Sequence, residues 1–264
     1  MASLKARSIQ NPFCSVVIPA YNEEARIISS LEKLLTYVKV QGWRSEIIVV
    51  DDGSGDRTSE IVRSFATDNR EIRLLKNSRN RGKGYSVRRG MLSAEGEVLL
   101  FTDADLSSPI EEIVKLLEAI RHGADIAIGS RWLRSSLQTQ RQSLRRQVLG
   151  RAFNLLPRFL LGLNYKDTQC GFKAFTRRAA IAIFPLQKIE GWGFDPEVLF
   201  LGKRAGFKVI EVPVAWAHSE GTRIRPFVDG VRMAWEMVKI RWNASTGEYA
   251  IRQETAAGST VTVG

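Results

Sequence analysis

Cysteine is almost missing from this chain: its 264 residues contain two, Cys14 and Cys170. Two cysteines are too few for a disulfide framework, and they do not have the spacing of a metal-binding pair. Both lie among apolar residues, so we expect small, buried, reduced side chains, as in proteins of a reducing compartment. A disulfide-stapled scaffold and a cysteine-ligated metal site are therefore excluded.

Long apolar runs are also missing. No stretch reaches the about 18 uninterrupted apolar residues that a membrane-spanning helix needs. The best candidate, 153–163, is short and contains Pro157 and Arg158. The N-terminal sequence MASLKARSIQNPF lacks the apolar core of a signal peptide. We expect a soluble or peripheral protein.

Acidic residues are absent between Ile126 and Tyr165, although arginine recurs there and the whole chain carries a net charge of +11. A solvated helix usually mixes charges of both signs, so this segment indicates an anionic partner. Phosphate, nucleic acid and anionic lipid all remain open at this point.

Short apolar segments alternate with helix-length amphipathic segments in the first half. The expected strands are 15–19, 46–50, 72–75, 98–102 and 125–128, and the expected helices are 23–40, 56–66, 84–94 and 109–121. This alternation predicts an α/β fold whose mainly parallel central sheet carries helices on both faces. Ligands of such sheets bind at the carboxyl ends of the strands.

The second half is less regular. We expect basic amphipathic helix at 144–163, helices at 177–184, 196–205 and 226–242, and strands at 172–175 and 208–212. The chain then divides into an N-terminal extension (1–12), a catalytic domain (13–224), an amphipathic C-terminal helix (225–246) and a flexible tail (247–264).

Polar or glycine-rich loops follow the expected strands: PAYNEE, DDGSGD, NSRNRGKG, TDADLSS and GSR. The most informative is Asp103-Ala104-Asp105. Two carboxylates one residue apart can bind a hard divalent cation together with a diphosphate. Alone, the same pattern also fits a solvated turn.

Asp51 and Asp52 close a second buried strand. An acidic pair at such a strand end can accept hydrogen bonds from a ribose hydroxyl and a base N–H. The alternative is an ordinary turn through Gly53, with Asp56 capping the next helix. Both descriptions can hold together.

Two cations and two glycines at 80–84 (NRGKG) precede a helix. Glycine lets the backbone approach a phosphate, and a helix N-terminus adds donors. The P-loop spacing is absent, and no GxGxxG follows the first strand, so dinucleotide binding is disfavoured. In PAYNEE, Asn22 can equally be a helix cap and Tyr21 a packing residue.

Together, VVIPAYNEE, IIVVDDGSGDRT, NRGKG and FTDADLSSP, in this order and spacing, resemble the large family of inverting nucleotide-sugar transferases with the GT-A fold. The resemblance runs from about Cys14 to Tyr249. In the second half, KDTQCGFK, WGFDPE, EVPV and EGTR are similar to the dolichyl-phosphate β-glucosyltransferase branch. The relatives that make dolichyl-phosphate mannose come next.

The resemblance implies a set of site residues. The uridine would be held by Pro19, Ala20, Tyr21, Glu23, Asp51 and Asp52, with Lys83 beside it. Mg²⁺ or Mn²⁺ and the diphosphate would be held by Asp103 and Asp105, with Ser107 near the metal. Ala104 and Gln169 are further substrate-binding candidates, and Arg131 would face a phosphate. The family's mobile loop corresponds to Gly221-Thr222-Arg223, where arginine replaces lysine and changes the donor geometry.

The implied reaction is a single in-line displacement, in which an acceptor phosphate oxygen attacks the anomeric carbon and UDP leaves. Asp167, Asp195 and Glu197 are candidates to orient the acceptor or the sugar. The alternative is that they cap helices or pair with Lys166, Lys173 or Arg177.

We therefore expect a metal-dependent transferase that moves glucose from UDP-glucose to a polyprenyl phosphate, peripheral at the cytoplasmic face of a membrane. Relatives carry membrane anchors that this sequence lacks, so 144–163 and 227–242 would contact the anionic membrane surface, unless they pack on the core or on a second subunit. The alternatives are another donor such as GDP-mannose, a soluble or polysaccharide acceptor, or a non-catalytic nucleotide-sugar binder. Nucleic-acid binding would not explain two carboxylate pairs.

Overall fold

The computed structural model describes residues 13–133, 156–217 and 226–250. In this part of the chain seven strands form one sheet in the order β3-β2-β1-β4-β6-β5-β7. The strands are β1 (Cys14–Ala20), β2 (Ser45–Asp51), β3 (Ile72–Lys76), β4 (Val98–Phe101), β5 (Ile126–Ser130), β6 (Lys173–Thr176) and β7 (Val209–Pro213).

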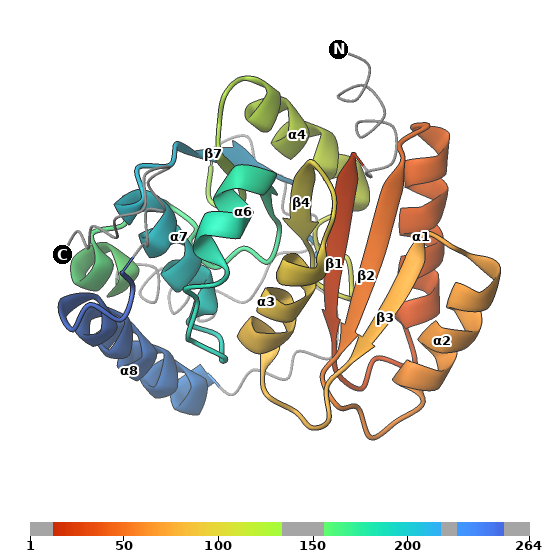
Figure 1. Cartoon of the computed structure of the whole chain (residues 1–264), viewed down its shortest axis with the longest axis horizontal. Helices are drawn as coiled ribbons and strands as arrows, with labels where there is room; N and C mark the ends of the chain where they lie inside the picture. Colours follow the sequence, from red (N-terminus) through yellow and green to blue (C-terminus); the bar gives the residue numbers. More distant parts are fainter. Residues whose placement is uncertain (1–12, 134–155, 218–225, 251–264) are drawn as a thin grey trace, which may run out of the picture.

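Helices follow most of these strands. They are α1 (Ile27–Val40), α2 (Thr58–Asp68), α3 (Lys83–Ser93), the 3-10 helix η2 (Ile110–Glu112), α4 (Ile113–Arg121), α6 (Arg177–Ile183), α7 (Phe194–Arg204) and α8 (Pro226–Ser245). Residues 156–161 are also helical. Figure 1 shows α1 and α2 together on one side of the sheet and α7 and α8 together on the other.

The sheet separates two apolar clusters, which explains why its strands are apolar without alternation. In β2, Ile47 and Val49 belong to the cluster under α1, α2 and α4, whereas Ile48 and Val50 belong to the cluster under α3, α6, α7 and α8. A strand buried on both faces needs apolar residues at every position. The predicted α/β class with helices on both faces is confirmed.

The sheet is mainly parallel, but β6 runs antiparallel to both of its neighbours, β4 and β5. The remaining pairs, β1 with β2 and β4, β2 with β3, and β5 with β7, are parallel. The expected strand at 172–175 is therefore present, displaced by one residue.

Beyond shifts of one to three residues at the ends of elements, three expectations differ from the structure. The helix expected from Glu23 begins at Ile27, because the preceding residues form a turn in which the Ile27 N–H donates to the Glu23 carbonyl. Tyr249, which we placed in the flexible tail, is buried, and its hydroxyl donates to Glu197. The segment expected as one helix at 109–121 begins with a turn of 3-10 helix.

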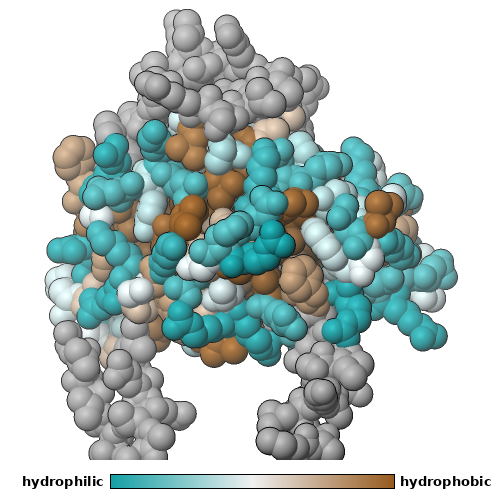
Figure 2. Space-filling view, turned by 90° about the horizontal axis from the view of Figure 1, so that it is seen from above, coloured by the Kyte–Doolittle hydropathy of each residue, from teal (hydrophilic) through white to brown (hydrophobic). Residues whose placement is uncertain are grey.

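Within the described ranges, no helix combines the length and the apolar character needed to cross a bilayer. The end of the molecule near α4 shows hydrophobic side chains scattered among hydrophilic ones (Figure 2). The candidate site lies at the other end, where the parallel strands β1, β2 and β4 finish (Figure 1).

Candidate active site at the carboxyl edge of the sheet

The two acidic loops start on either side of β1. Ala20 is paired with Asp51 of β2, and Val17 is paired with Phe101 of β4. The two loops therefore leave neighbouring positions on one sheet edge. Two loop residues, Asn22 (φ 52°) and Leu106 (φ 47°), have left-handed backbones that are uncommon outside glycine and concentrate at functional sites.

Asp52 is enclosed by backbone and amide donors. The side chain of Asn77 (2.7 Å) and the backbone N–H groups of Arg81 (3.0 Å) and Gly82 (2.7 Å) all donate to its carboxylate. Gly82 has a φ of 109°, and a side chain there would collide with the Glu190 carbonyl. We expected Gly82 to let the backbone approach a phosphate. In the structure it lets the NRGKG loop reach the Asp52 carboxylate.

Asp51 is fully buried and accepts from the Ser54 N–H (3.1 Å) and from the hydroxyls of Ser54 and Ser59. It closes the turn that follows β2. The Asp56 side chain accepts from the Thr58 N–H (2.9 Å) at the start of α2. The turn alternative therefore describes Asp51, whereas the N-cap position of α2 is Arg57, without a side-chain cap hydrogen bond, and uridine binding by the acidic pair stays a prediction.

Lys83 connects the two acidic loops. Lys83 directly follows Gly82, whose N–H donates to the Asp52 carboxylate. The Lys83 ammonium forms an ion pair with Asp103. Burial acts to lower the pKa of Lys83, but the carboxylates of Asp103 and Asp195 outweigh it and raise that pKa. The side chain is 14% exposed and its nitrogen lies 5.4 Å from the Trp192 ring centre. The Lys83 ammonium thus lies on Asp103, and the backbone N–H of the residue just before it is bonded to Asp52.

The Asp103–Asp105 loop fits a divalent metal. The Asp103 side chain is 38% exposed, and one Asp105 oxygen accepts from the Ser107 N–H (2.9 Å), which leaves further lone pairs. Residues 13–133, 156–217 and 226–250 contain no group of three or more His, Cys, Asp or Glu side chains arranged to hold a metal. Mg²⁺ is commonly held by one or two carboxylates plus substrate phosphates, so two suffice.

Gly171 supports Asp103 from the side. A methyl group at position 171 would overlap the Asp103 carboxylate. The residue stands two positions before β6, so the antiparallel strand brings it against the metal-binding loop. The sequence motif DTQCGF contains this glycine, but its contact with Asp103 depends on the sheet topology.

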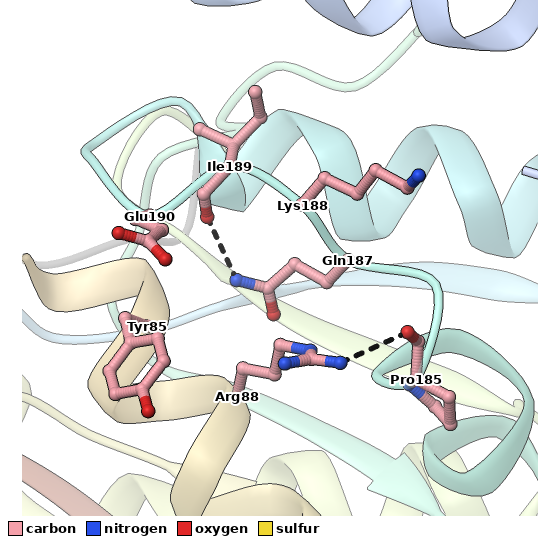
Figure 3. Close-up of a pocket in the computed structure, with 7 residues that line it drawn as sticks. All are labelled: Tyr85, Arg88, Pro185, Gln187, Lys188, Ile189 and Glu190. Atoms are coloured by element: carbon pink, nitrogen blue, oxygen red, sulfur yellow. Dashed lines mark hydrogen bonds between the residues drawn. The ribbon is translucent and has the colours of Figure 1, made fainter. Parts of the chain in front are cut away.

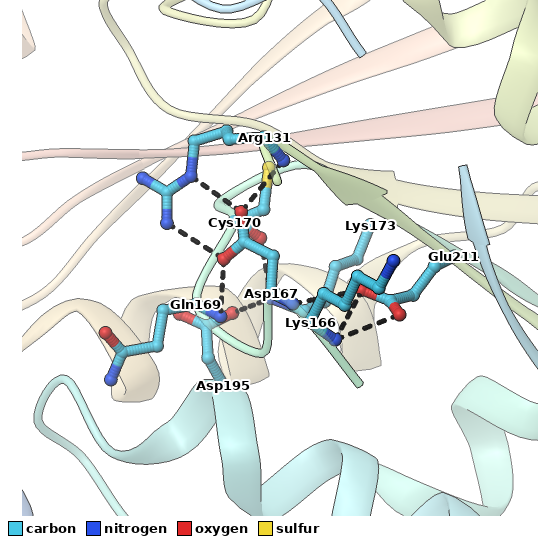
Figure 4. A network of polar contacts seen from close by, with 8 residues as sticks. All are labelled: Arg131, Lys166, Asp167, Gln169, Cys170, Lys173, Asp195 and Glu211. Atoms are coloured by element: carbon cyan, nitrogen blue, oxygen red, sulfur yellow. Dashed lines mark hydrogen bonds and ion pairs between the residues drawn. The ribbon is translucent and has the colours of Figure 1, made fainter. Parts of the chain in front are cut away.

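Arg131 and Asp167 form a second buried unit (Figure 4). The guanidinium donates to both Asp167 oxygens (2.7 and 2.9 Å), and the Arg131 N–H donates to one of them (3.0 Å). Asp167 is fully buried. Burial acts to raise the pKa of Asp167, but Arg131 outweighs it and holds that pKa below its usual value.

This pairing changes our expectation for both residues. Arg131 was expected to face a phosphate, yet its fork is occupied by Asp167. The alternative of an ion pair is right for Asp167, although the partner is Arg131 instead of a nearby lysine. Glu211 of β7 fixes the same loop by accepting from the Lys166 and Asp167 N–H groups (2.9 and 3.0 Å).

Asp195 forms an ion pair with Lys173, whose side chain is completely buried, as the alternative expected. Burial raises the pKa of Asp195. Glu197 accepts from the Lys188 and Ile189 N–H groups (3.0 and 2.9 Å) and from Tyr249. Glu197 therefore holds a loop in place within the core.

The remaining predicted residues divide by exposure. Ala20 and Ala104 are buried, whereas Tyr21 is 37% exposed. Pro19, Glu23 and Ser107 are partly buried, and so is Gln169, whose amide donates to the Met233 sulfur (3.7 Å). Asn22 ties PAYNEE to the DDGSGD loop through Gly55 (2.8 Å), so it is no cap of α1. Arg223 lies outside the described residues.

Three residues of the site were missed from the sequence: Asn77, Gly171 and Trp192. Asn77 directly follows β3, just as Asp52 directly follows β2, and that shared position was the available signal. Trp192 lies in the WGFDPE motif, which we used only for the resemblance.

A separate pocket of about 280 Å³ lies behind the NRGKG loop (Figure 3). Tyr85 and Arg88 of α3 face the segment 185–190 across it. The acidic pairs do not line this pocket, so it is distinct from the candidate site.

The mainly parallel sheet, with acidic loops at its carboxyl edge and Lys83 paired to Asp103, fits a nucleotide-sugar transferase of the GT-A class. Residues 15–184 match the model of the family described as glycosyl transferase family 2. The chain belongs to this family and is a glycosyltransferase.

Curated relatives cover most of the chain. A dolichyl-phosphate beta-glucosyltransferase of Saccharomyces cerevisiae is 38% identical over 256 residues, 90% of this chain and 76% of the relative. The enzymes of the same name from Dictyostelium discoideum and Homo sapiens are 36% and 34% identical, over 92% and 90% of this chain and 78% of each relative.

Solved structures share the fold. Glucosyl-3-phosphoglycerate synthase from Mycobacterium tuberculosis, in complex with Mn²⁺, UDP and glucosyl-3-phosphoglycerate, has a TM-score of 0.65 at 23% identity and covers 91% of this chain and 82% of that one. The same enzyme with Mn²⁺, UDP-glucose and glycerol 3-phosphate has a TM-score of 0.64 at 22% identity, with the same coverage.

Proposed function

We propose that this glycosyltransferase moves glucose from UDP-glucose to a polyprenyl phosphate with inversion at the anomeric carbon, using Mg²⁺ or Mn²⁺ held by Asp103 and Asp105. The observation that carries the proposal is the ion pair of Lys83 with Asp103, made by a segment whose preceding residue, Gly82, donates to Asp52. A diphosphate needs a cationic site of this kind next to a nucleoside-binding edge.

The curated relatives support the sugar and the acceptor, because all three carry the name dolichyl-phosphate beta-glucosyltransferase. The titles of the solved neighbours, which name UDP, UDP-glucose and Mn²⁺ or Mg²⁺, support the donor and the metal.

The residues divide the work as follows. Asp52, Tyr21 and the first-strand loop bind the uridine, and Lys83 balances charge on the leaving diphosphate. Mg²⁺ or Mn²⁺, when bound, adds further neutralisation of that charge. The acceptor phosphate oxygen forms the new bond to the anomeric carbon while the bond from that carbon to the UDP oxygen breaks. Such an oxygen is already ionised near neutral pH, so no strong general base is required.

Arg131 and Asp167 shape the acceptor side. Asp167 holds the guanidinium in a fixed orientation beside Trp216, whose ring centre lies 5.7 Å from Arg131. The pair is a positioning unit in this proposal, because the Asp167 carboxylate is buried. The reaction takes place at the cytoplasmic face of a membrane, and the two free buried cysteines support a reducing compartment.

The test is transfer of radiolabelled glucose from UDP-glucose to a polyprenyl phosphate, with and without Mn²⁺. We expect label in an organic-extractable, mild-acid-labile product. Asp105→Asn should lose activity by about 10²-fold or more, whereas Asp68→Asn, an exposed control on α2, should not. Label found only in a water-soluble product would defeat the acceptor assignment, and equal use of GDP-mannose would defeat the donor assignment.

A further inference from the structure

Helix α8 carries two separate apolar faces. Met233, Met237 and Ile240 pack into the core, as expected for one face of a surface helix. A second set on the opposite side is exposed, namely Val231 (60%), Trp235 (68%), Val238 (46%) and Trp242 (68%). The spacing of four, three and four residues puts this second set on one stripe within about 60° of the helix circumference. We call these four residues the outer stripe.

Cations border the outer stripe on both sides. Arg232 and Lys239 lie along one side and Arg241 lies along the other, and all three are exposed. The acidic Glu236 is 8% exposed, accepts from the Gly193 N–H (2.7 Å) and pairs with Arg232 (3.4 Å), so Lys239 and Arg241 are the border cations that have no carboxylate partner among the described residues. An apolar stripe with tryptophans and cationic borders is the pattern of a helix that lies in a membrane interface.

The inner side of α8 touches the candidate active site. Met233 accepts the hydrogen bond from Gln169, in the loop that also contains Asp167. Glu236 packs against Gly191 and Gly193, the two neighbours of Trp192, which lies beside Lys83. The outer stripe therefore lies on a helix that contacts two loops of the site directly.

We propose that the outer stripe docks on the surface of an anionic lipid bilayer, with α8 parallel to the membrane plane and the site loops held at the lipid headgroups. The reason for this arrangement, delivery of a membrane-embedded acceptor phosphate, rests on the proposed function; the docking itself does not. A lipid-linked phosphate presents its reactive oxygen at headgroup depth, where the site then opens.

Charge favours a bilayer over a second copy of the chain. Two copies joined through their outer stripes would bring Lys239 and Arg241 of both together, whereas Arg232 is paired with Glu236. Among the α8 side chains that the structure describes, no exposed carboxylate is present to compensate them. Anionic headgroups compensate all of them at once.

The test is co-sedimentation of the full chain with vesicles of phosphatidylcholine, with and without phosphatidylglycerol. Trp235→Ala/Trp242→Ala should weaken partitioning by about tenfold or more, since both side chains would be buried in the interface. Leu92→Ala/Ile181→Ala removes exposed apolar side chains from α3 and α6 and should leave partitioning unchanged. Equal partitioning of the first variant and the unchanged chain would overturn the proposal.

A second variant tests the charge. Lys239→Gln/Arg241→Gln should no longer bind vesicles with phosphatidylglycerol better than vesicles without it. Its circular dichroism spectrum should match that of the unchanged chain. Light scattering tests whether a second copy of the chain binds the outer stripe instead. If the chain is a dimer, and Trp235→Ala/Trp242→Ala makes it a monomer without changing vesicle binding, the proposal is also overturned. Transfer to a short, water-soluble polyprenyl phosphate should be equal in all variants. Loss of transfer to every acceptor by the unmodified chain would instead defeat the proposed function.

Discussion

The ammonium of Lys83 lies on the carboxylate of Asp103, and the backbone just before Lys83 donates to Asp52. One short segment therefore joins the two acidic strand ends. Since the Lys83 ammonium is fixed on Asp103, a cation already stands at this edge when a diphosphate arrives.

Replacing that cation tests its role. Lys83→Met should lower kcat by about 10²-fold, because a charge on the leaving diphosphate would lose its partner, and Lys83→Arg should recover part of the loss. Steady-state kinetics with UDP-glucose provides the measurement. Lys33→Met, on the exposed side of α1, is the matched control. Unchanged kcat in the first variant would contradict this role.

Gly171 offers a test of the Asp103 position. Gly171→Ala should displace the Asp103 carboxylate and weaken Mn²⁺ binding in the presence of UDP by about tenfold, with the free energy of unfolding lowered by less than about 1 kcal/mol. Isothermal titration calorimetry and thermal unfolding give the two quantities. Gly55→Ala, which meets no atom within 4 Å, should alter neither. Equal Mn²⁺ affinity in both variants would show that the contact is unimportant.

The buried Arg131–Asp167 pair should dominate local stability. Arg131→Met leaves a buried carboxylate without its partner and should lower the free energy of unfolding by about 3–5 kcal/mol, while Arg131→Met/Asp167→Leu should recover much of that loss. Urea unfolding measures both. Arg178→Met breaks the exposed pair with Asp125 and should cost less than about 1 kcal/mol. A double variant as unstable as the single one would refute this account.

The same pair sets a pH dependence. Because the folded pKa of Asp167 lies below its unfolded value of about 3.9, its stabilising contribution is complete above that value and is lost as the pH falls through the folded pKa. Urea midpoints measured from neutral to strongly acidic pH should therefore fall less steeply for Asp167→Asn than for the unchanged chain. Parallel curves would contradict the expectation.

Tyr249 provides the last test. Its hydroxyl donates to buried Glu197, so Tyr249→Phe should lower the free energy of unfolding by about 1–3 kcal/mol. Tyr37→Phe, at a partly buried tyrosine of α1, should change it by less than about 0.5 kcal/mol. The midpoints of chemical denaturation compare the two tyrosine variants. Equal midpoints would show that the hydrogen bond from Tyr249 to Glu197 does not contribute to stability.

Much of the fold could be predicted because its strands are buried on both faces and therefore form unbroken apolar runs. The β2 strand was expected at 46–50 and extends by one residue at each end. The start of α1 was misplaced because the residues after Asn22 satisfy a neighbouring loop before the helix begins. The hydrophobic periodicity of a sequence carries no information about such contacts between loops.

The acidic residues of the site could likewise be predicted, since each follows an apolar strand. Their partners could not. Asp51 accepts hydrogen bonds from Ser54 and Ser59, and Asp52 accepts one from Asn77, just after the next strand. Arg131 pairs with Asp167 from a distant segment. Which donor reaches which carboxylate depends on strand order, and the antiparallel β6 is too short to reveal its neighbours from its sequence.

The position of β6 has a consequence for how the chain assembles. The strands β3, β2, β1 and β4 are adjacent and complete once residue 101 has left the ribosome, whereas β5 pairs only with β6 and β7. A nascent chain that stops before β6 thus leaves one side of β4 and both sides of β5 unpaired, a state prone to aggregation. Since Gly171 arrives with β6, its contact with the Asp103 carboxylate forms late, and the candidate site is complete only after synthesis has passed this point.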